Sequence, residues 1–193
     1  MSLSDQLSAR ITDALLGLLS KTPTSSLAPA TDPAAKTAAI VSAAAKKAAT
    51  VSGTLAIPPG PLGMVTVLPD LLIIWKIQQQ MVADIAAVHG KTAVLNERTM
   101  AYCLFRHSSA SFVRDLVART GSRYLVKRAT LKMIRLSLKR IGIRITQRVL
   151  GKSISRLIPL IGAAAVAGYA YYDTTKVAGT AAEFFSRDIE LEE

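Results

Sequence analysis

The chain of 193 residues fits one domain of ordinary size, and it carries a formal net charge of +11. Half of the residues are hydrophobic but only 5% are aromatic, which favours helices packed through small side chains and argues against a β-sandwich. A single cysteine, Cys103, excludes a disulfide within this chain and a site built from several thiolates, so a cytoplasmic location is expected.

The first predicted element is an amphipathic helix that begins near Ser2 or Ser4. Its apolar positions recur at spacings of three and four residues and are Leu7, Ile11, Leu15 and Leu18. The following segment, 21–31, contains two prolines and several serines and threonines, which is typical of a flexible tether. Residues 1–30 are therefore predicted to be an N-terminal helix with its tether, and residues 31–193 a helical domain.

The second predicted helix is alanine-rich and has clear signals at both ends. Thr31 or Asp32 is expected to cap it, Pro33 to stand in its first turn and Gly53 to end it. A fourth helix is expected from about Asn96 and a fifth from about Ser109.

Between these helices lies an apolar segment, 57–75. Its stretch from Val65 to Trp75 holds eleven residues and one charge, Asp70, and is too short for a membrane span of about 20 residues. A buried core helix and a shallow re-entrant hairpin both fit this pattern. The helix that follows is expected to end at His89, before Gly90.

Positive charge is concentrated between Arg114 and Arg156, where the sequence has thirteen basic residues and one acidic residue, Asp115. The spacing within this window predicts a helix with a basic face and an apolar face. The basic residues predicted to bind a membrane surface are Arg128, Lys132, Arg135, Lys139, Arg140, Arg144 and Arg148. Such a helix fits the headgroup layer of an anionic bilayer, but the same pattern is also typical of the solvated face of a core helix.

A second apolar segment, 157–172, begins with fifteen residues that carry no charge. We therefore predict an all-α, compact bundle of six to eight helices. Two apolar helices, Met64 to Gly90 and Leu157 to Tyr172, are expected at its centre, flanked by the basic amphipathic segment. The pattern does not decide whether 57–75 and 157–172 enter lipid or form a soluble core.

The order of these features resembles the EcsC family over roughly Pro33 to Arg187. The similar blocks are Leu68-Pro69-Asp70-Leu71-Leu72, Ile85-Ala86-Ala87-Val88-His89-Gly90, Leu157-Ile158-Pro159-Leu160-Ile161-Gly162-Ala163-Ala164 and Tyr172-Asp173-Thr174-Thr175-Lys176-Val177-Ala178-Gly179, followed by Ala181, Ala182 and Phe185. His89 stands where the family often has tyrosine. The resemblance implies a helical protein that, in some relatives, acts with an ABC-type transporter, and it supplies no established active site.

Two carboxylates are candidate functional residues because each lies beside an apolar run. Burial of Asp70 or Asp173 without a partner costs several kcal/mol. Asp70 follows Pro69, where a carboxylate in the first turn of a helix also serves as a cap. Asp173 is expected to pair with a basic residue.

Other chemistry has little support in the sequence. His107 follows Cys103 by four residues and shares a helix face with it, but no third group completes a catalytic site. We expect no catalytic residue, cofactor or metal, with Cys103 packed in the core and His107 exposed. We do not expect nucleic acid as the main partner, because Tyr124 is the one aromatic residue in the basic stretch Arg123–Arg156.

The functional hypothesis is a non-enzymatic accessory or scaffold protein on the inner face of the cell membrane, peripheral or shallowly inserted. Its expected partner is the anionic phospholipid surface. The alternatives are a hydrolytic or lipid-modifying enzyme with a buried carboxylate and a nonspecific nucleic-acid binder.

Overall fold

The structure, a computed structural model, describes residues 3–55, 63–108, 116–127, 131–151 and 159–192. Within these residues it is an α-helical bundle with one small sheet, which confirms the predicted fold class. The α-helices are α1 (Leu3–Leu19), α2 (Pro33–Leu55), α3 (Gly63–Val88), α4 (Glu97–Phe105), α6 (Leu131–Gly151) and α7 (Pro159–Phe185). The shorter elements are the 3-10 turns η1 (Thr92–Val94) and η2 (Arg106–Ser108) and the strands β1 (Val117–Thr120), β2 (Arg123–Val126) and β3 (Asp188–Leu191).

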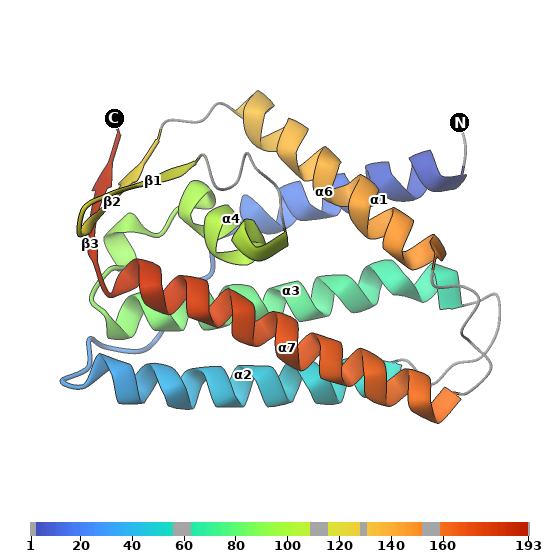
Figure 1. Cartoon of the computed structure of the whole chain (residues 1–193), viewed down its shortest axis with the longest axis horizontal. Helices are drawn as coiled ribbons and strands as arrows, with labels where there is room; N and C mark the ends of the chain where they lie inside the picture. The colour runs from blue at the N-terminus through green and yellow to red at the C-terminus, as the bar shows by residue number, and fades with distance from the viewer. Residues whose placement is uncertain (1–2, 56–62, 109–115, 128–130, 152–158, 193) are drawn as a thin grey trace.

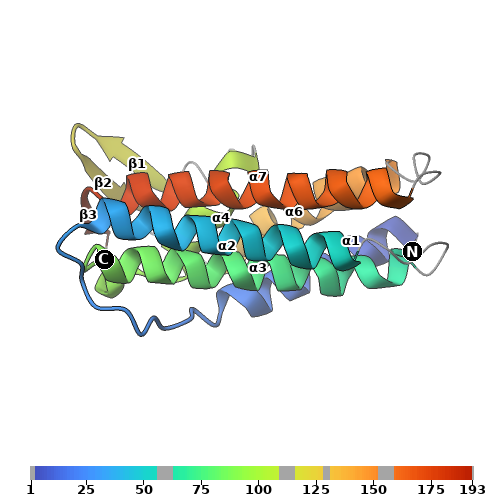
Figure 2. The same cartoon turned by 90° about the horizontal axis from the view of Figure 1, so that it is seen from below.

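The three long helices α2, α3 and α7 pack against one another along the length of the molecule (Figures 1 and 2). The pair α1 and α6 covers one side of them, and α4 lies between this pair and α7 (Figure 1). The sheet stands at one end of the bundle (Figure 1). Sequence-distant helices are therefore the main packing partners.

One hydrophobic core joins nearly all of these elements. Its largest fully buried side chains are Ile11, Leu15, Leu19, Met81, Ile85, Met100, Leu104, Tyr124, Leu138, Phe184 and Phe185. Since α1 supplies three of them, this helix packs into the same core as the rest of the chain. The predicted division at residue 30 therefore separates two segments that share one core.

Three predicted helix boundaries agree with the structure. The Asp32 carboxylate accepts a hydrogen bond from the Ala35 amide at 3.0 Å and caps α2. Asn96 caps α4 through a reciprocal capping box with Thr99. Gly90 follows α3 with a φ of +68°, a left-handed conformation that favours glycine. Gly53, predicted to end the second helix, instead lies inside α2, because the alanine-rich sequence around it continues the helix.

The segment between α1 and α2, predicted to be a flexible tether, lies along α3 and bonds to it. The Ser25 hydroxyl donates to the Asp84 carboxylate at 2.7 Å, and the Ala30 amide donates to the Val88 carbonyl at 3.0 Å. The Gln80 side chain also donates to the Thr24 carbonyl. These contacts fix the path of the chain from the end of α1 to the start of α2.

The sheet was not predicted. The expected fifth helix from Ser109 falls partly outside the described residues, but Val117–Thr120 form strand β1 instead of helix. β1 pairs antiparallel with β2, with Thr120 opposite Arg123, and Gly121 in the turn has a φ of +62°. β3 adds parallel to β2 from the distant C-terminal part of the chain, so the sheet depends on a non-local contact.

The N-terminal halves of α3 and α7, which carry the described parts of the two apolar segments, lie at the same end of the bundle, opposite the sheet (Figures 1 and 2). We call the end formed by the N-terminal halves of α3 and α7 the apolar end. The large hydrophobic side chains exposed there are Ile73, Val166, Tyr169, Tyr171 and Tyr172. The two helices do pack together, as predicted. Among the described side chains from Ala164 to Tyr172, however, Ala170 is the one that is buried, and the other buried side chains of α7 follow Asp173. The expectation that Leu157 to Tyr172 forms the centre is therefore wrong for most of its described side chains.

One helical stretch in the described residues, Leu71–Val88, is long and apolar enough to cross a bilayer. Of this stretch, 61% is buried inside the protein. A core helix has the same properties, so this stretch alone does not distinguish lipid from protein surroundings.

Candidate functional site

Asp173, one of the two candidate carboxylates, pairs with a histidine at the centre of the bundle. Its Oδ1 lies 2.8 Å from His107 Nε2, and its Oδ2 accepts a hydrogen bond of 2.8 Å from the Gln78 amide. Gln78 also contacts the Thr174 hydroxyl at 3.3 Å, and both residues are buried. The expectation that Asp173 pairs with a basic residue is confirmed, and the network joins α3, η2 and α7.

The structure corrects the prediction for His107 and confirms that Cys103 packs in the core. The His107 side chain is 23% exposed, not free in solvent, and its partner is Asp173. Cys103 is completely buried, and burial raises the pKa of its thiol, which opposes formation of a nucleophilic thiolate. The sequence spacing of four residues therefore does not indicate a dyad.

The His107–Asp173 pair resembles part of a general-base arrangement, since the carboxylate orients the imidazole. Among the described residues, however, no hydroxyl or thiol bonds to His107, and its Nδ1 is buried without a partner. Within the described part of the chain, the arrangement therefore holds a proton-transfer group with no nucleophile bonded to it. What it does is connect three helical elements.

This role gives a testable expectation for stability. Asp173→Ala is expected to lower the free energy of unfolding by about 2 kcal/mol, because it leaves the buried Gln78 amide and the His107 ring short of partners. Asp173→Asn, which retains a side-chain acceptor for Gln78, is expected to cost less than half as much. Urea denaturation measures both. A loss below about 0.5 kcal/mol for Asp173→Ala would contradict the structural role and favour a functional one.

Asp70, the other candidate, lies at a different place in its helix from the one predicted. Because α3 begins at Gly63, Asp70 follows Pro69 in the interior of the helix, not in its first turn. The helix-dipole explanation for this carboxylate is therefore wrong. The Asp70 side chain lies outside the described part of the structure.

The predicted basic face belongs to α6, whose apolar face is already covered. Ile134, Leu138 and Ile141 are buried in the core, and α6 packs against α1. Four basic residues of α6 are exposed, and they are Arg135, Lys139, Arg140 and Arg144. Arg128 and the side chains of Lys132 and Arg148 lie outside the described part.

Exposed apolar side chains accompany these charges. Met133, Leu136 and Ile143 lie on the exposed surface of α6, with Leu136 52% exposed. A purely solvated face would carry few large apolar groups, whereas a surface that contacts lipid headgroups carries both kinds. Helix α6 thus retains an amphipathic outer surface even though its inner face is occupied.

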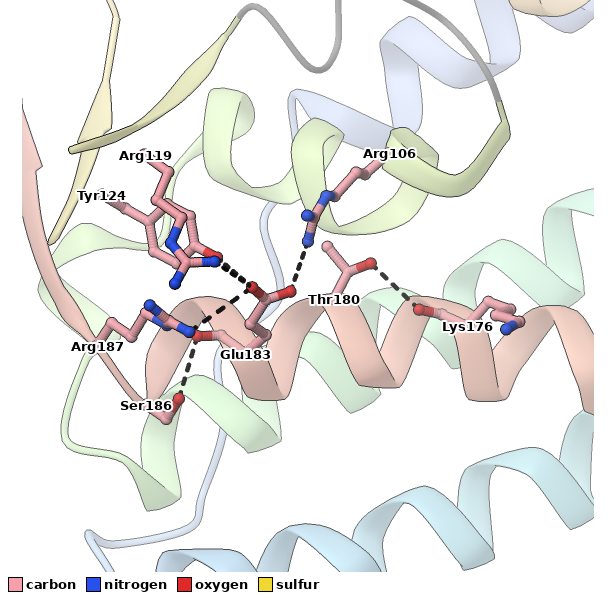
Figure 3. A network of polar contacts seen from close by, with 8 residues as sticks. All are labelled: Arg106, Arg119, Tyr124, Lys176, Thr180, Glu183, Ser186 and Arg187. Atoms are coloured by element: carbon pink, nitrogen blue, oxygen red, sulfur yellow. Dashed lines mark hydrogen bonds and ion pairs between the residues drawn. The ribbon is translucent and has the colours of Figure 1, made fainter. Parts of the chain in front are cut away.

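A second polar network, absent from the sequence predictions, surrounds Glu183 of α7 (Figure 3). Its carboxylate accepts hydrogen bonds from Arg106 and from the Tyr124 hydroxyl, both at 2.7 Å. Arg119 and Arg187 lie 3.9 Å from Oε1. The hydrogen bonds from Arg106 and Tyr124 hold the pKa of Glu183 below its ordinary value of 4.5. The network ties α7 to η2 and to the hairpin.

Aromatic rings cover one side of this network. Tyr124 packs against Phe184 with centroids 5.2 Å apart, and Tyr102 packs against the same ring at 5.5 Å. Burial raises the pKa of Tyr102 to about 12. The guanidinium groups of Arg106 and Arg187 lie over Tyr102 and Tyr124. Because its carboxylate is saturated with donors, Glu183 is a structural group.

The described residues contain no cluster of three His, Cys, Asp or Glu side chains that fits a metal ion. The other histidine, His89, lies 3.3 Å from the Thr37 hydroxyl and links α3 to α2. Its pKa is lowered by burial and by the nearby Lys91.

No protein family, curated protein or solved structure that was compared with the chain matches it. The resemblance to the EcsC family therefore stays a prediction.

Proposed function

We propose that the protein is a membrane-associated, non-enzymatic accessory or scaffold protein that binds an anionic phospholipid surface through its apolar end. The observation that carries this proposal is the exposure of α7 before Asp173. Residues 164–172 carry no charge, and Val166, Tyr169, Tyr171 and Tyr172 are each more than 40% exposed. A patch of this kind on a soluble protein marks a surface that contacts a partner or lipid.

The tyrosines support lipid as that partner. Tyrosine rings favour the boundary between hydrocarbon and headgroups, where the ring is in an apolar layer and the hydroxyl contacts water. Because the three tyrosines lie within four positions of one helix, their rings would lie at a similar depth in a bilayer. Ile73 of α3 adds an exposed aliphatic side chain to the same end of the bundle.

The charge on α6 supports an anionic surface. Arg135, Lys139, Arg140 and Arg144 are exposed on one helix, and each basic residue near an anionic bilayer contributes about 1 kcal/mol. Because the apolar face of α6 packs on α1, the basic side chains would act from the headgroup layer without insertion of the helix. A cytoplasmic location and a transporter partner are further parts of this proposal and derive from the cysteine content and the EcsC resemblance.

Two matched variants, each of which replaces an alanine with glutamate, test the apolar end. Ala165→Glu places a carboxylate on the exposed N-terminal half of α7, and Ala38→Glu places one on the exposed N-terminal part of α2, at the opposite end of the bundle. We expect Ala165→Glu to weaken flotation with phosphatidylglycerol-containing liposomes at least about tenfold, because a charge at this depth must be desolvated. Ala38→Glu should bind like the wild type. Equal binding by both variants would exclude the apolar end as the contact.

A second pair of variants tests the charge. Arg140→Gln with Arg144→Gln is expected to weaken binding to anionic liposomes about 30-fold, from two contributions of about 1 kcal/mol. The control, Lys36→Gln with Lys127→Gln, removes the same net charge from exposed positions outside α6. If both double variants lose the same affinity, net charge and not the α6 surface controls binding. Failure of the wild type to bind either anionic or neutral liposomes would refute the proposed function.

A further inference from the structure

A groove of about 780 Å³ lies between α1 and α6. One wall carries acidic and hydroxyl side chains from α1, including Asp5, Ser8 and Asp13, and the other carries Arg135 and Lys139 from α6. The two basic residues are four positions apart and lie on one helix face. The groove therefore presents opposite charges on opposite walls.

Asp13 on one wall is not neutralised by Arg135 or Lys139 on the other. Asp13, Arg135 and Lys139 make no ion pair within the part of the chain that the structure describes. The close approach of the helices at Gly142 sets the distance between the walls, since a side-chain carbon there would lie 2.9 Å from Thr12 Oγ1. A ligand that bridges the walls needs an anionic and a cationic group.

Thr146 adds a second, independent sign of a binding site. The residue lines the groove and is only 2% exposed, and its Oγ1 has no hydrogen-bond partner among the described residues. Buried polar atoms in folded proteins are nearly always hydrogen-bonded, to protein or to another molecule. The acceptor oxygen of a ligand such as a phosphate ester is the kind of partner that this hydroxyl lacks.

We propose that this groove binds the headgroup of a zwitterionic aminophospholipid, with its phosphate against Arg135 and Lys139 and its ammonium group against Asp13. The inference rests on the proposed membrane function and adds to it a binding site for the headgroup of one class of lipid. Figure 1 shows the N-terminal half of α1 at the same end of the bundle as the start of α7. Ile143 in the groove lining is 39% exposed and offers an apolar contact to the start of the acyl chains.

Titration calorimetry with short-chain phosphatidylethanolamine, below its micelle concentration, tests the groove without a membrane. We expect saturable binding by the wild type and about tenfold weaker binding by Arg135→Gln and by Asp13→Asn. Short-chain phosphatidylglycerol lacks the ammonium group, so its binding should be weakened by Arg135→Gln and unchanged by Asp13→Asn. Arg140→Gln, on α6 but outside the groove, should bind both lipids like the wild type.

Absence of saturable binding, or equal effects of Arg135→Gln and Arg140→Gln, would overturn the groove assignment. Equal affinity for glycerophosphoethanolamine would overturn the lipid and indicate a water-soluble phosphate ester. These failures differ from failure of the proposed function. A protein that floats with liposomes but does not bind the short-chain lipid lacks only the groove site, and one that binds the lipid but does not float lacks only the membrane contact.

Discussion

Glu183→Ala is expected to lower the free energy of unfolding by about 3 kcal/mol. The substitution removes the acceptor for Arg106 and Tyr124 and leaves three guanidinium groups close together without their carboxylate. Breaking a buried ion pair typically costs 3–5 kcal/mol, and the partial exposure of Glu183 places this case at the lower end. Chemical denaturation with an unchanged m-value measures the loss.

Glu190→Ala provides the matched control. Its carboxylate also accepts a hydrogen bond of 2.7 Å from an arginine, Arg123, but both side chains are more than half exposed. Exposed ion pairs contribute up to about 1 kcal/mol. If Glu190→Ala costs as much as Glu183→Ala, burial and the additional partners of Glu183 have no energetic importance.

The Glu183 network also predicts a pH dependence. Because hydrogen bonds from Arg106 and Tyr124 lower the pKa of Glu183 in the folded state, its contribution to stability is present above its ordinary value of 4.5. The contribution is lost as the pH falls through the lowered folded-state pKa. The stability difference between the wild type and Glu183→Gln should therefore shrink in acid. A difference that is constant with pH would contradict this assignment.

Gly142→Val is expected to lower the free energy of unfolding by about 3 kcal/mol, and Gly142→Ala by about 2 kcal/mol. A Cβ atom at this buried position would lie 2.9 Å from Thr12 Oγ1 and 3.0 Å from the Ser8 carbonyl oxygen. Because the second contact is backbone, the clash cannot be relieved by a rotamer change, and α1 must move away from α6. Thermal and urea unfolding measure the effect.

Gly17→Ala is the control on α1, where a Cβ atom meets nothing within 4 Å. Replacement of glycine by alanine inside a helix favours folding by about 1 kcal/mol. The two Gly→Ala substitutions are thus expected to have opposite signs. Stabilisation by Gly142→Ala would show that α1 and α6 are not in close contact in solution.

The helices that local sequence determines were predictable. Asp32, Gly90 and Asn96 act through neighbours within four residues, so their chemistry marks helix ends whatever the tertiary structure. The apolar stripe of α1 likewise predicts its buried face. Gly53 shows the limit of this reasoning, because a glycine in an alanine-rich sequence is compatible with both a helix end and a helix interior.

The features that depend on distant partners were not predictable. The strands at Val117–Thr120 and Arg123–Val126 are only four residues long, and the third strand comes from Asp188–Leu191. The burial of α7 could not be read from hydropathy, since most of the described side chains in the uncharged stretch 164–172 are exposed.

The candidate sites likewise depend on partners that are distant in the sequence. His107 lies beside Cys103 in sequence but bonds to Asp173, and Glu183 collects partners from three elements. Spacing along one helix identifies the basic side of α6 but not the residue that a histidine meets across the bundle.

The pairing of α1 with α6 and of α2 with α7 has a consequence for folding kinetics. Even the central bond between Gln78 and Asp173 joins residues 95 positions apart, so the chain has a high contact order for a helical protein. Such topologies fold slowly, because long loops must close before their contacts form. During synthesis, α1 lacks α6 and α2 lacks α7 until these later helices leave the ribosome, and in that interval a chaperone can shield the apolar faces that stay uncovered.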